Sequence, residues 1–127
     1  MVLNSNKDKG RAGLSLAIAY FGSNGYTVSL PLNDTQDYDL IVDKDNKLSK
    51  VQVRFTDEYS KYGVYVCPLR STSGTTRKTI STIKDTSVDL LFVATSNMSL
   101  YLIPKKDIIN SSAINLGEKY EKYQVII

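Results

Sequence analysis

Within the segment of residues 48–55, a strict alternation of apolar and polar side chains over residues 50–55 constrains the fold of this chain more than any other feature of its sequence. The apolar positions are Val51, Val53 and Phe55, and the polar positions are Lys50, Gln52 and Arg54. Successive side chains of a strand point to opposite faces of its sheet. The alternation therefore predicts a strand with one buried face and one polar face.

A second predicted strand, residues 38–42, precedes this one and is separated from it by a turn over residues 43–47. Two strands so close in sequence pair as a hairpin, which brings side chains of one strand beside those of the other. The hairpin therefore places Asp39 near Gln52 and Arg54. A carboxylate, an amide and a guanidinium are predicted to meet on one surface.

The clearer of the remaining segments predict one helix and several more strands. Residues 8–21 repeat apolar side chains at helical spacing, and the Gly-Ser-Asn-Gly segment that follows ends the predicted helix. Residues 88–94 are an apolar run, typical of a strand covered on both faces. The other predicted strands are residues 26–30, 62–69 and 100–103.

Three segments have weaker patterns. Residues 70–78 are rich in Ser, Thr and Gly and predict a mobile basic loop, and residues 79–85 predict a short helical piece. The tail, residues 115–127, is compatible with a short helix or an edge strand. The order of elements predicts an α/β fold of the mixed α+β type. A length of 127 residues without repeats or a linker predicts a single domain, residues 1–127.

The absence of histidine restricts the possible chemistry. A chain with no histidine and a single cysteine, Cys67, lacks the side chains for a zinc hydrolase site or a Ser-His-Asp triad. Any catalysis must use carboxylates, amides, Lys, Arg, Tyr or a hard metal ion. A net charge of +3 is compatible with a polyanionic partner but does not identify one.

The sequence also gives an expectation for the cellular location. A single cysteine forms no internal disulfide, which favours a reducing compartment. The chain shows no secretory signal and no run of the roughly 18 apolar residues that a membrane span requires. We therefore expect a soluble, cytoplasmic protein without a membrane partner.

Asp39 is the strongest candidate for a functional residue. It stands between Tyr38 and the apolar residues 40–42. An unpaired carboxylate in such a place is unfavourable unless a cation or hydrogen bonds compensate its charge. One interpretation is a Mg²⁺ ligand, and the other is an aspartate at a strand end that faces solvent or caps a turn. The residue alone leaves both open.

Several motifs together resemble the PD-(D/E)XK nuclease superfamily, in particular the small homing endonucleases encoded by group I introns. The motifs are Lys9-Gly10 and Gly13 at the helix start, residues 31–42 with Asp39, and Gln52-Val53-Arg54. The resemblance covers nearly the whole chain. It implies a restriction-endonuclease-like core, in which helices flank a central mixed β-sheet and the central hairpin carries the active site.

The resemblance also implies a metal site. Asp39, the Gln52 side chain and the Val53 backbone carbonyl would hold Mg²⁺ or Mn²⁺, and no small-molecule cofactor is expected. Gln52 stands where the superfamily usually has Glu or Asp. A glutamine oxygen still ligates a hard cation, but it brings no negative charge and so weakens the site.

Two further positions depart from the family pattern. Arg54 stands where the family has its catalytic lysine, and Leu14 stands where intron-encoded members commonly have a metal-associated glutamate. An arginine stabilises charge on a phosphate but stays protonated, so it does not act as a base. The catalytic set implied by the resemblance is therefore Asp39, Gln52 and Arg54. Another carboxylate could take the place of the missing glutamate, and spacing does not distinguish the candidates Asp8, Asp34, Asp37 and Glu58.

Two clusters of basic residues are candidates for contacts with DNA phosphates. They are Lys7, Lys9 and Arg11 near the helix start, and Arg70, Arg77 and Lys78 in the predicted loop. A solvated helix end explains the first cluster equally well. Tyr62 and Tyr65 are expected to pack on the sheet rather than stack on bases. The resemblance implies double-stranded DNA as the partner of a homo-oligomer, a dimer or tetramer, whose subunits face DNA half-sites.

Three functions follow from these observations. The first is a Mg²⁺-dependent DNA endonuclease of the homing type. The second is a catalytically inactive module of a mobile element or phage that binds DNA or a protein, for example to interfere with a host defence nuclease. The third is an interaction domain unrelated to nucleic acids. Salt-dependent DNA binding separates the third from the others, and metal-dependent cleavage separates the first two.

Overall fold

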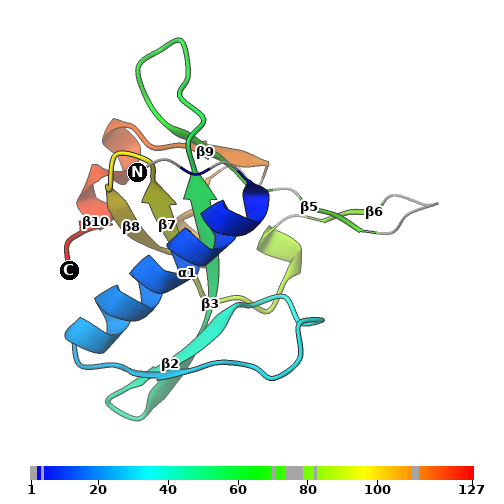
Figure 1. Ribbon diagram of the computed structural model, residues 1–127, viewed down its shortest axis with the longest axis vertical. Helices are drawn as coiled ribbons and strands as arrows, with labels where there is room; N and C mark the ends of the chain where they lie inside the picture. Colours follow the sequence, from blue (N-terminus) through cyan, green and yellow to red (C-terminus); the bar gives the residue numbers. More distant parts are fainter. Residues whose placement is uncertain (1–2, 4, 70, 74–78, 82, 110–111) are drawn as a thin grey trace.

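A mixed six-stranded sheet lies at the centre of the molecule (Figure 1). The computed structural model describes residues 3, 5–69, 71–73, 79–81, 83–109 and 112–127. In spatial order the strands are β1 (Thr27–Ser29), β2 (Leu40–Lys44), β3 (Lys47–Thr56), β7 (Leu90–Thr95), β8 (Leu100–Pro104) and β10 (Gln124–Val125). Neighbouring strands pair antiparallel except β3 and β7, which are parallel. The predicted mixed α/β class is confirmed.

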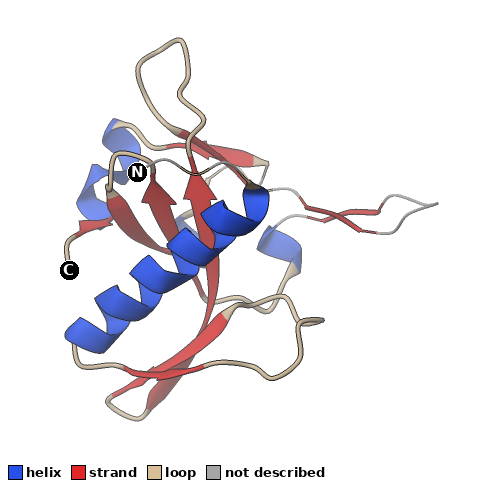
Figure 2. Ribbon diagram, viewed as in Figure 1, coloured by secondary structure: helices blue, strands red, loops and turns tan. Residues whose placement is uncertain are grey.

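One long helix, α1 (Asn6–Ser23), covers one face of this sheet (Figure 2). It contains the predicted helix, residues 8–21, and is slightly longer at both ends. Ser5 caps its start, because the Ser5 Oγ accepts a hydrogen bond from the backbone N–H of Asp8 at 3.1 Å. Such a cap satisfies one of the free N–H groups of the first helical turn.

Gly13 allows α1 to lie directly against β3. A Cβ atom at this position would be 3.3 Å from Phe55 Cβ and 3.3 Å from Val53 Cγ1, closer than most packed side chains. The glycine therefore fixes the distance between the helix and the strand that carries Gln52.

The opposite face of the sheet is covered by short elements. They are β4 (Val66–Pro68) paired with β9 (Ala113–Asn115), and the 3₁₀ helices η1 (Ile83–Asp85), η2 (Lys105–Asp107) and η3 (Glu118–Tyr123). Strand β7 contributes to the apolar clusters on both faces: Phe92 packs on the α1 side, and Leu91 and Val93 pack on the other side. The prediction of a strand covered on both faces is confirmed.

A two-residue turn sets the register of the β2–β3 hairpin. Asp45 and Asn46 have φ angles of 54° and 65°, the left-handed conformation that such tight hairpin turns require. The pairing puts Leu40 opposite Val51. Asp39 precedes the paired residues and hydrogen-bonds to Val51 and Val53, the two residues of β3 on either side of Gln52, so the hairpin brings Asp39 close to the Gln52 segment as predicted.

The predicted strand of residues 62–69 is largely wrong. Only Val66–Pro68 is a strand, and it pairs with β9 outside the central sheet. Residues 57–65 instead form a projecting loop, in which the side chain of Tyr62 is 80% exposed. The expectation that Tyr62 packs on the sheet is therefore wrong, because alternation in a loop has no sheet face to follow.

The region after residue 70 also differs from the prediction. Ser71–Ser73 (β5) and Thr79–Ser81 (β6) pair as an antiparallel hairpin, so only η1 of the predicted helical piece is helical. The tail combines both predicted alternatives, since η3 is followed by β10 at the edge of the sheet. No helix within the described residues has the length and apolar character to cross a membrane.

Candidate active site

Asp39 is held at the start of the central hairpin by two hydrogen bonds to β3. Its backbone N–H donates to the Val51 carbonyl at 2.8 Å. Its carboxylate Oδ2 accepts from the backbone N–H of Val53 at 2.7 Å. Strand β2 begins only at Leu40, so Asp39 precedes the strand, and its side chain remains exposed to solvent. The carboxylate is thus oriented by the protein and still accessible to a ligand.

Gln52 brings an amide oxygen to the neighbouring strand. Its Oε1 atom is buried and has no hydrogen-bond partner among the described residues. Leaving a buried acceptor without a partner costs about 1–3 kcal/mol. A buried oxygen of this kind beside an oriented carboxylate is suited to a bound cation or water.

The Val53 carbonyl lies on the edge of β3 that faces β2. In an extended strand the N–H and C=O of one residue lie on the same edge. The Val53 N–H is directed at Asp39, so the Val53 carbonyl lies on that edge too. One carboxylate, one amide oxygen and one backbone carbonyl are therefore available at this end of the hairpin.

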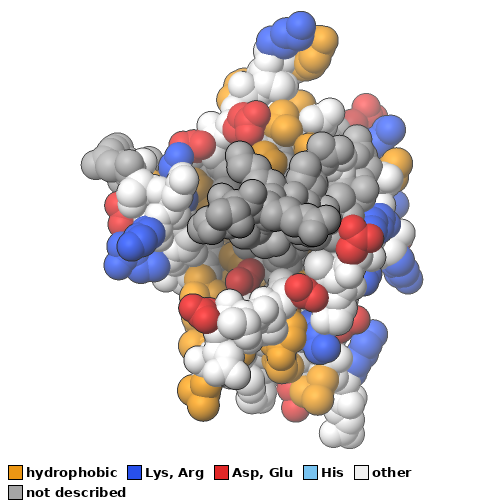
Figure 3. Space-filling model, turned by 90° about the vertical axis from the view of Figure 1, so that its right-hand side faces the viewer, with side chains coloured by type: hydrophobic (Ala, Val, Ile, Leu, Met, Phe, Trp, Pro, Cys, Tyr) orange, Lys and Arg blue, Asp and Glu red, His pale blue; other side chains and the backbone are white. Residues whose placement is uncertain are grey.

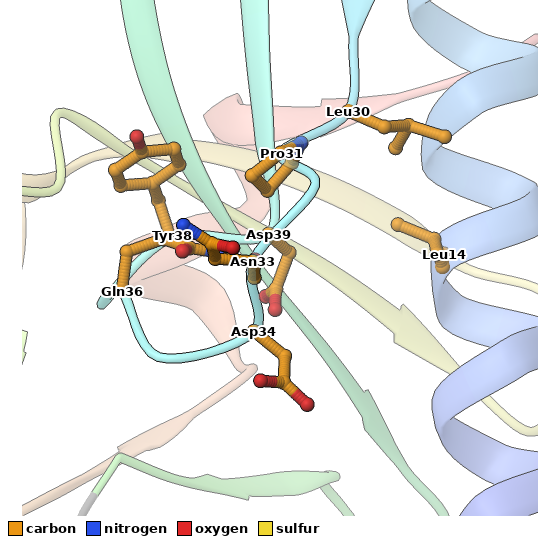
Figure 4. Close-up of a pocket in the computed structure, with 8 residues that line it drawn as sticks. All are labelled: Leu14, Leu30, Pro31, Asn33, Asp34, Gln36, Tyr38 and Asp39. Atoms are coloured by element: carbon orange, nitrogen blue, oxygen red, sulfur yellow. The ribbon is translucent and has the colours of Figure 1, made fainter.

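A pocket opens beside Asp39 (Figure 4). It is lined by Leu14, Leu30, Pro31, Asn33, Asp34, Gln36, Tyr38 and Asp39. The side chain of Leu14 enters it from α1, and the carboxylates of Asp34 and Asp39 are directed to the same side of the loop of residues 31–38 (Figure 4). An apolar side chain thus occupies the helix side of the pocket, and a second carboxylate enters from the loop.

Sequence reasoning did not single out Asp34. No spacing rule distinguishes it from Asp37, another carboxylate of the same loop. Its position depends on how the loop closes, with the Gln36 Nε2 donating to the Asn33 carbonyl. The available signal was weak, namely a turn-forming Asn-Asp pair between Pro31 and the strand.

Arg54 lies on the same side of β3 as Gln52, two residues further along the strand. It is half-buried, and its positive charge acts on the Cys67 thiol in β4. Burial raises the pKa of Cys67 to about 12, while Arg54 lowers it and Glu58 raises it. The Arg54 charge is therefore close enough to β4 to be felt by the Cys67 thiol. Cys67 remains a buried, protonated thiol, as expected of a structural residue.

The predicted DNA-binding residues near the helix start are partly engaged in ion pairs. Lys9 Nζ is 2.8 Å from Asp57 Oδ2, and Arg11 Nη2 is 2.8 Å from Asp8 Oδ1. Lys7 is exposed at the start of α1. The other three predicted residues, Arg70, Arg77 and Lys78, lie outside the described residues.

These groups favour a hard cation held weakly. Oxygen ligands of this type suit Mg²⁺ or Mn²⁺. Within the part of the chain that the structure describes, no three Asp, Glu, Cys or His side chains converge on one point. A cation here would depend mainly on Asp39 for its charge compensation.

Comparisons with known proteins agree with this geometry. A family model described as PD-(D/E)XK endonuclease matches residues 4–125. Among solved structures, the chain is similar to a bacterial homing endonuclease, I-Ssp6803I, with a TM-score of 0.80 and 27% sequence identity. The match covers 95% of this chain and 89% of that one. No curated protein matches the chain.

Proposed function

Because the chain belongs to the PD-(D/E)XK endonuclease family, we propose that it is a homing-type endonuclease that hydrolyses phosphodiester bonds of double-stranded DNA with Mg²⁺ or Mn²⁺. The family resemblance seen in the sequence is confirmed. One observation carries the proposal: the Val53 N–H orients the carboxylate of Asp39, and the neighbouring residue of β3, Gln52, has a buried Oε1 with no partner among the described residues. We propose that these two oxygens share a cation.

The residues present are compatible with such an ion. Asp39, Gln52 and the Val53 carbonyl supply only oxygen ligands, which Mg²⁺ prefers. Asp34 adds a second carboxylate at the pocket without being on either strand. When bound, the ion would lower the pKa of a water molecule and polarise the scissile phosphate.

The chain's own residues supply orientation and charge. The Val53 N–H fixes one oxygen of Asp39, so the carboxylate loses little freedom when it binds a ligand. Arg54 would offer its guanidinium to the negative charge that develops on the phosphate. Since an arginine stays protonated, it would not accept a proton from the attacking water. Water itself must therefore lose its proton to solvent or to a carboxylate such as Asp34.

We further propose that the protein acts as a homo-oligomer. Two subunits related by a two-fold axis would each face one half-site of the DNA. Each subunit would then bring its own Asp39 site to one of the two DNA strands.

Plasmid cleavage tests the proposal. Supercoiled DNA is incubated with the wild-type chain, Asp39→Ala and Arg54→Lys in Mg²⁺, in Mn²⁺ and in EDTA. We expect metal-dependent nicking by the wild type that is lost in Asp39→Ala and increased about tenfold or more in Arg54→Lys, because lysine is the family's residue at this position. Nicking that persists in Asp39→Ala would contradict the proposed site.

A second candidate function is supported by two residues. Leu14 places an apolar side chain in the pocket, and Arg54 stands where the family has its lysine but is not among the residues that line the Asp39 pocket. A protein of this family with those substitutions would bind DNA, or another protein, without cutting. If Arg54→Lys cuts and the wild type does not, the arginine has silenced an intact site. If neither cuts any substrate, the binding module becomes the better description.

A further inference from the structure

The loop of residues 57–65, hereafter the tyrosine loop, projects beyond the end of β3 (Figure 1). Two of its aromatic side chains face solvent, Tyr62 with 80% and Tyr59 with 61% exposure. In the side view, the highest part of the molecule ends in a basic and a hydrophobic side chain (Figure 3). Tyr59 packs within the loop, whereas the Tyr62 ring has only the Lys61 side chain beside it among the described residues.

The tyrosine loop is internally bonded. The Ser60 backbone N–H donates to the Val64 carbonyl at 2.8 Å, and the Tyr59 hydroxyl donates to the Gly63 carbonyl at 2.8 Å. Gly63 has a φ of 81°, which suits glycine at the turn. The ring of Tyr59 also packs edge-on against Tyr65 at 4.9 Å between centroids. These contacts hold the loop in one shape and present its tip as a fixed feature.

The tip combines an aromatic ring with a positive charge. Lys61 Nζ lies 5.2 Å from the centroid of the Tyr62 ring, and both residues are exposed. At the base of the loop the negative charge of Asp57 is compensated by Lys9 at 2.8 Å. The hydrogen bond from Lys9 lowers the pKa of Asp57, so this pair persists at neutral pH. Glu58, also at the base of the loop, is exposed. The positive charge is therefore confined to the turn of residues 60–63, which carries Lys61 beside the ring of Tyr62.

We propose that Tyr62 and Lys61 form a DNA contact separate from the site around Asp39. The Lys61 ammonium would bind a backbone phosphate, and the Tyr62 ring would pack against a base or a deoxyribose. The loop follows directly from β3, the strand that carries Gln52 and Arg54, so a duplex at that site would pass near the loop. This inference rests on the proposed function, because it assumes DNA as the partner.

A nucleic acid explains the tip better than a second copy of the chain does. A stable protein interface buries about 800 Å² on each partner, which is far more than one tyrosine and one lysine supply. An aromatic ring beside a cation is the combination that contacts bases and phosphates in nucleic-acid complexes. A subunit contact is therefore kept as an outcome of the test.

The chain contains no tryptophan, so Tyr62→Trp introduces a single tryptophan at the tip, whose emission is excited separately from that of the tyrosines. A mixed-sequence duplex is titrated into the variant in EDTA, where no cleavage interferes. We expect the emission to be quenched as the DNA binds. Leu48→Trp, at a side chain that is 67% exposed in the β2–β3 hairpin, is the matched control and should change much less.

Binding affinity gives the second measurement. We expect Tyr62→Ala to weaken binding of the same duplex about tenfold and Tyr62→Phe to retain most of the affinity, because the ring makes the contact. Lys61→Ala should reduce the salt slope of binding by about one, while Lys119→Ala, another exposed lysine, leaves it unchanged. Circular dichroism checks that each variant is folded.

The outcomes separate this inference from the proposed function. If the wild type binds DNA and the tip variants bind equally well, the tyrosine loop is not a DNA contact, while the proposed nuclease stands. If Tyr62→Ala dissociates an oligomer in sedimentation without DNA, the loop is a subunit contact and the inference is overturned. If the wild type binds no DNA, both fail. Binding through the tip without any cleavage supports the inference and argues for the inactive alternative.

Discussion

Among single residues, Gln52 offers a test of the metal site that needs no catalysis. Glutamate at this position would place a second negative charge beside Asp39, and two like charges disfavour each other's ionised form. We expect Gln52→Glu to lower the free energy of unfolding in EDTA by about 1–3 kcal/mol. Adding Mg²⁺ should restore the Tm, because a ligand that binds only the folded state stabilises it.

The control for this change is Gln124→Glu, at an exposed position in β10. Its Tm should be nearly the same in EDTA and in Mg²⁺. An equal response of both variants to Mg²⁺ would mean that the buried Oε1 of Gln52 is not part of a cation site.

Asp34 and Asp37 form a matched pair in one loop. Only Asp34 lines the pocket with Asp39, although both side chains are exposed. Removing a nearby carboxylate weakens the attraction for a divalent cation. We expect Asp34→Asn to weaken Mn²⁺ binding, measured by calorimetry, about tenfold, or ~1.4 kcal/mol. Asp37→Asn should bind Mn²⁺ as tightly as the wild type does. If Asp37→Asn weakens Mn²⁺ binding and Asp34→Asn does not, the cation lies elsewhere.

Among the elements, the contact between α1 and β3 is the most sensitive to substitution. Gly13→Ala would place a methyl group 3.3 Å from Phe55 Cβ and Val53 Cγ1. Overpacking of this kind costs about 1–3 kcal/mol. Gly10→Ala is the control, since nothing lies within 4 Å of its Cβ and alanine favours helix by about 0.5–1 kcal/mol. Urea unfolding should show destabilisation of the first variant and stabilisation of the second.

The elements also show which parts of the fold a sequence can predict. The alternation around Gln52 predicted β3 and its polar face, because side chains that alternate with a period of two are explained by a strand whose residues point to opposite faces of a sheet. The same reasoning failed at Tyr62, where a loop happens to alternate. Asp39 and Gln52 were found through the hairpin, which is local in sequence. Asp34 was not, because its position depends on how the loop of residues 31–38 closes, with Gln36 bonded to Asn33, and no spacing in the sequence encodes this.

At the scale of the whole molecule, two apolar clusters share one strand. Phe21 packs on the α1 side of the sheet and Cys67 on the other side, and β7 contributes Phe92 to the first cluster and Leu91 to the second. Strand β7 cannot leave the sheet without exposing both clusters. We therefore expect the proposed single domain of residues 1–127 to unfold in one cooperative transition.

Cys67 makes that cooperativity measurable. Burial raises the pKa of its thiol from 9.0 to about 12, so at about pH 9 the unfolded chain carries much thiolate and the native chain very little. Because the folded pKa is the higher one, stability should fall as the pH rises above about 9. In urea at pH 8, thiol labelling and loss of the helical signal of α1 should share one midpoint, and this midpoint should decrease at pH 10. Labelling at lower urea than the helical transition would mean that the β4–β9 layer opens alone.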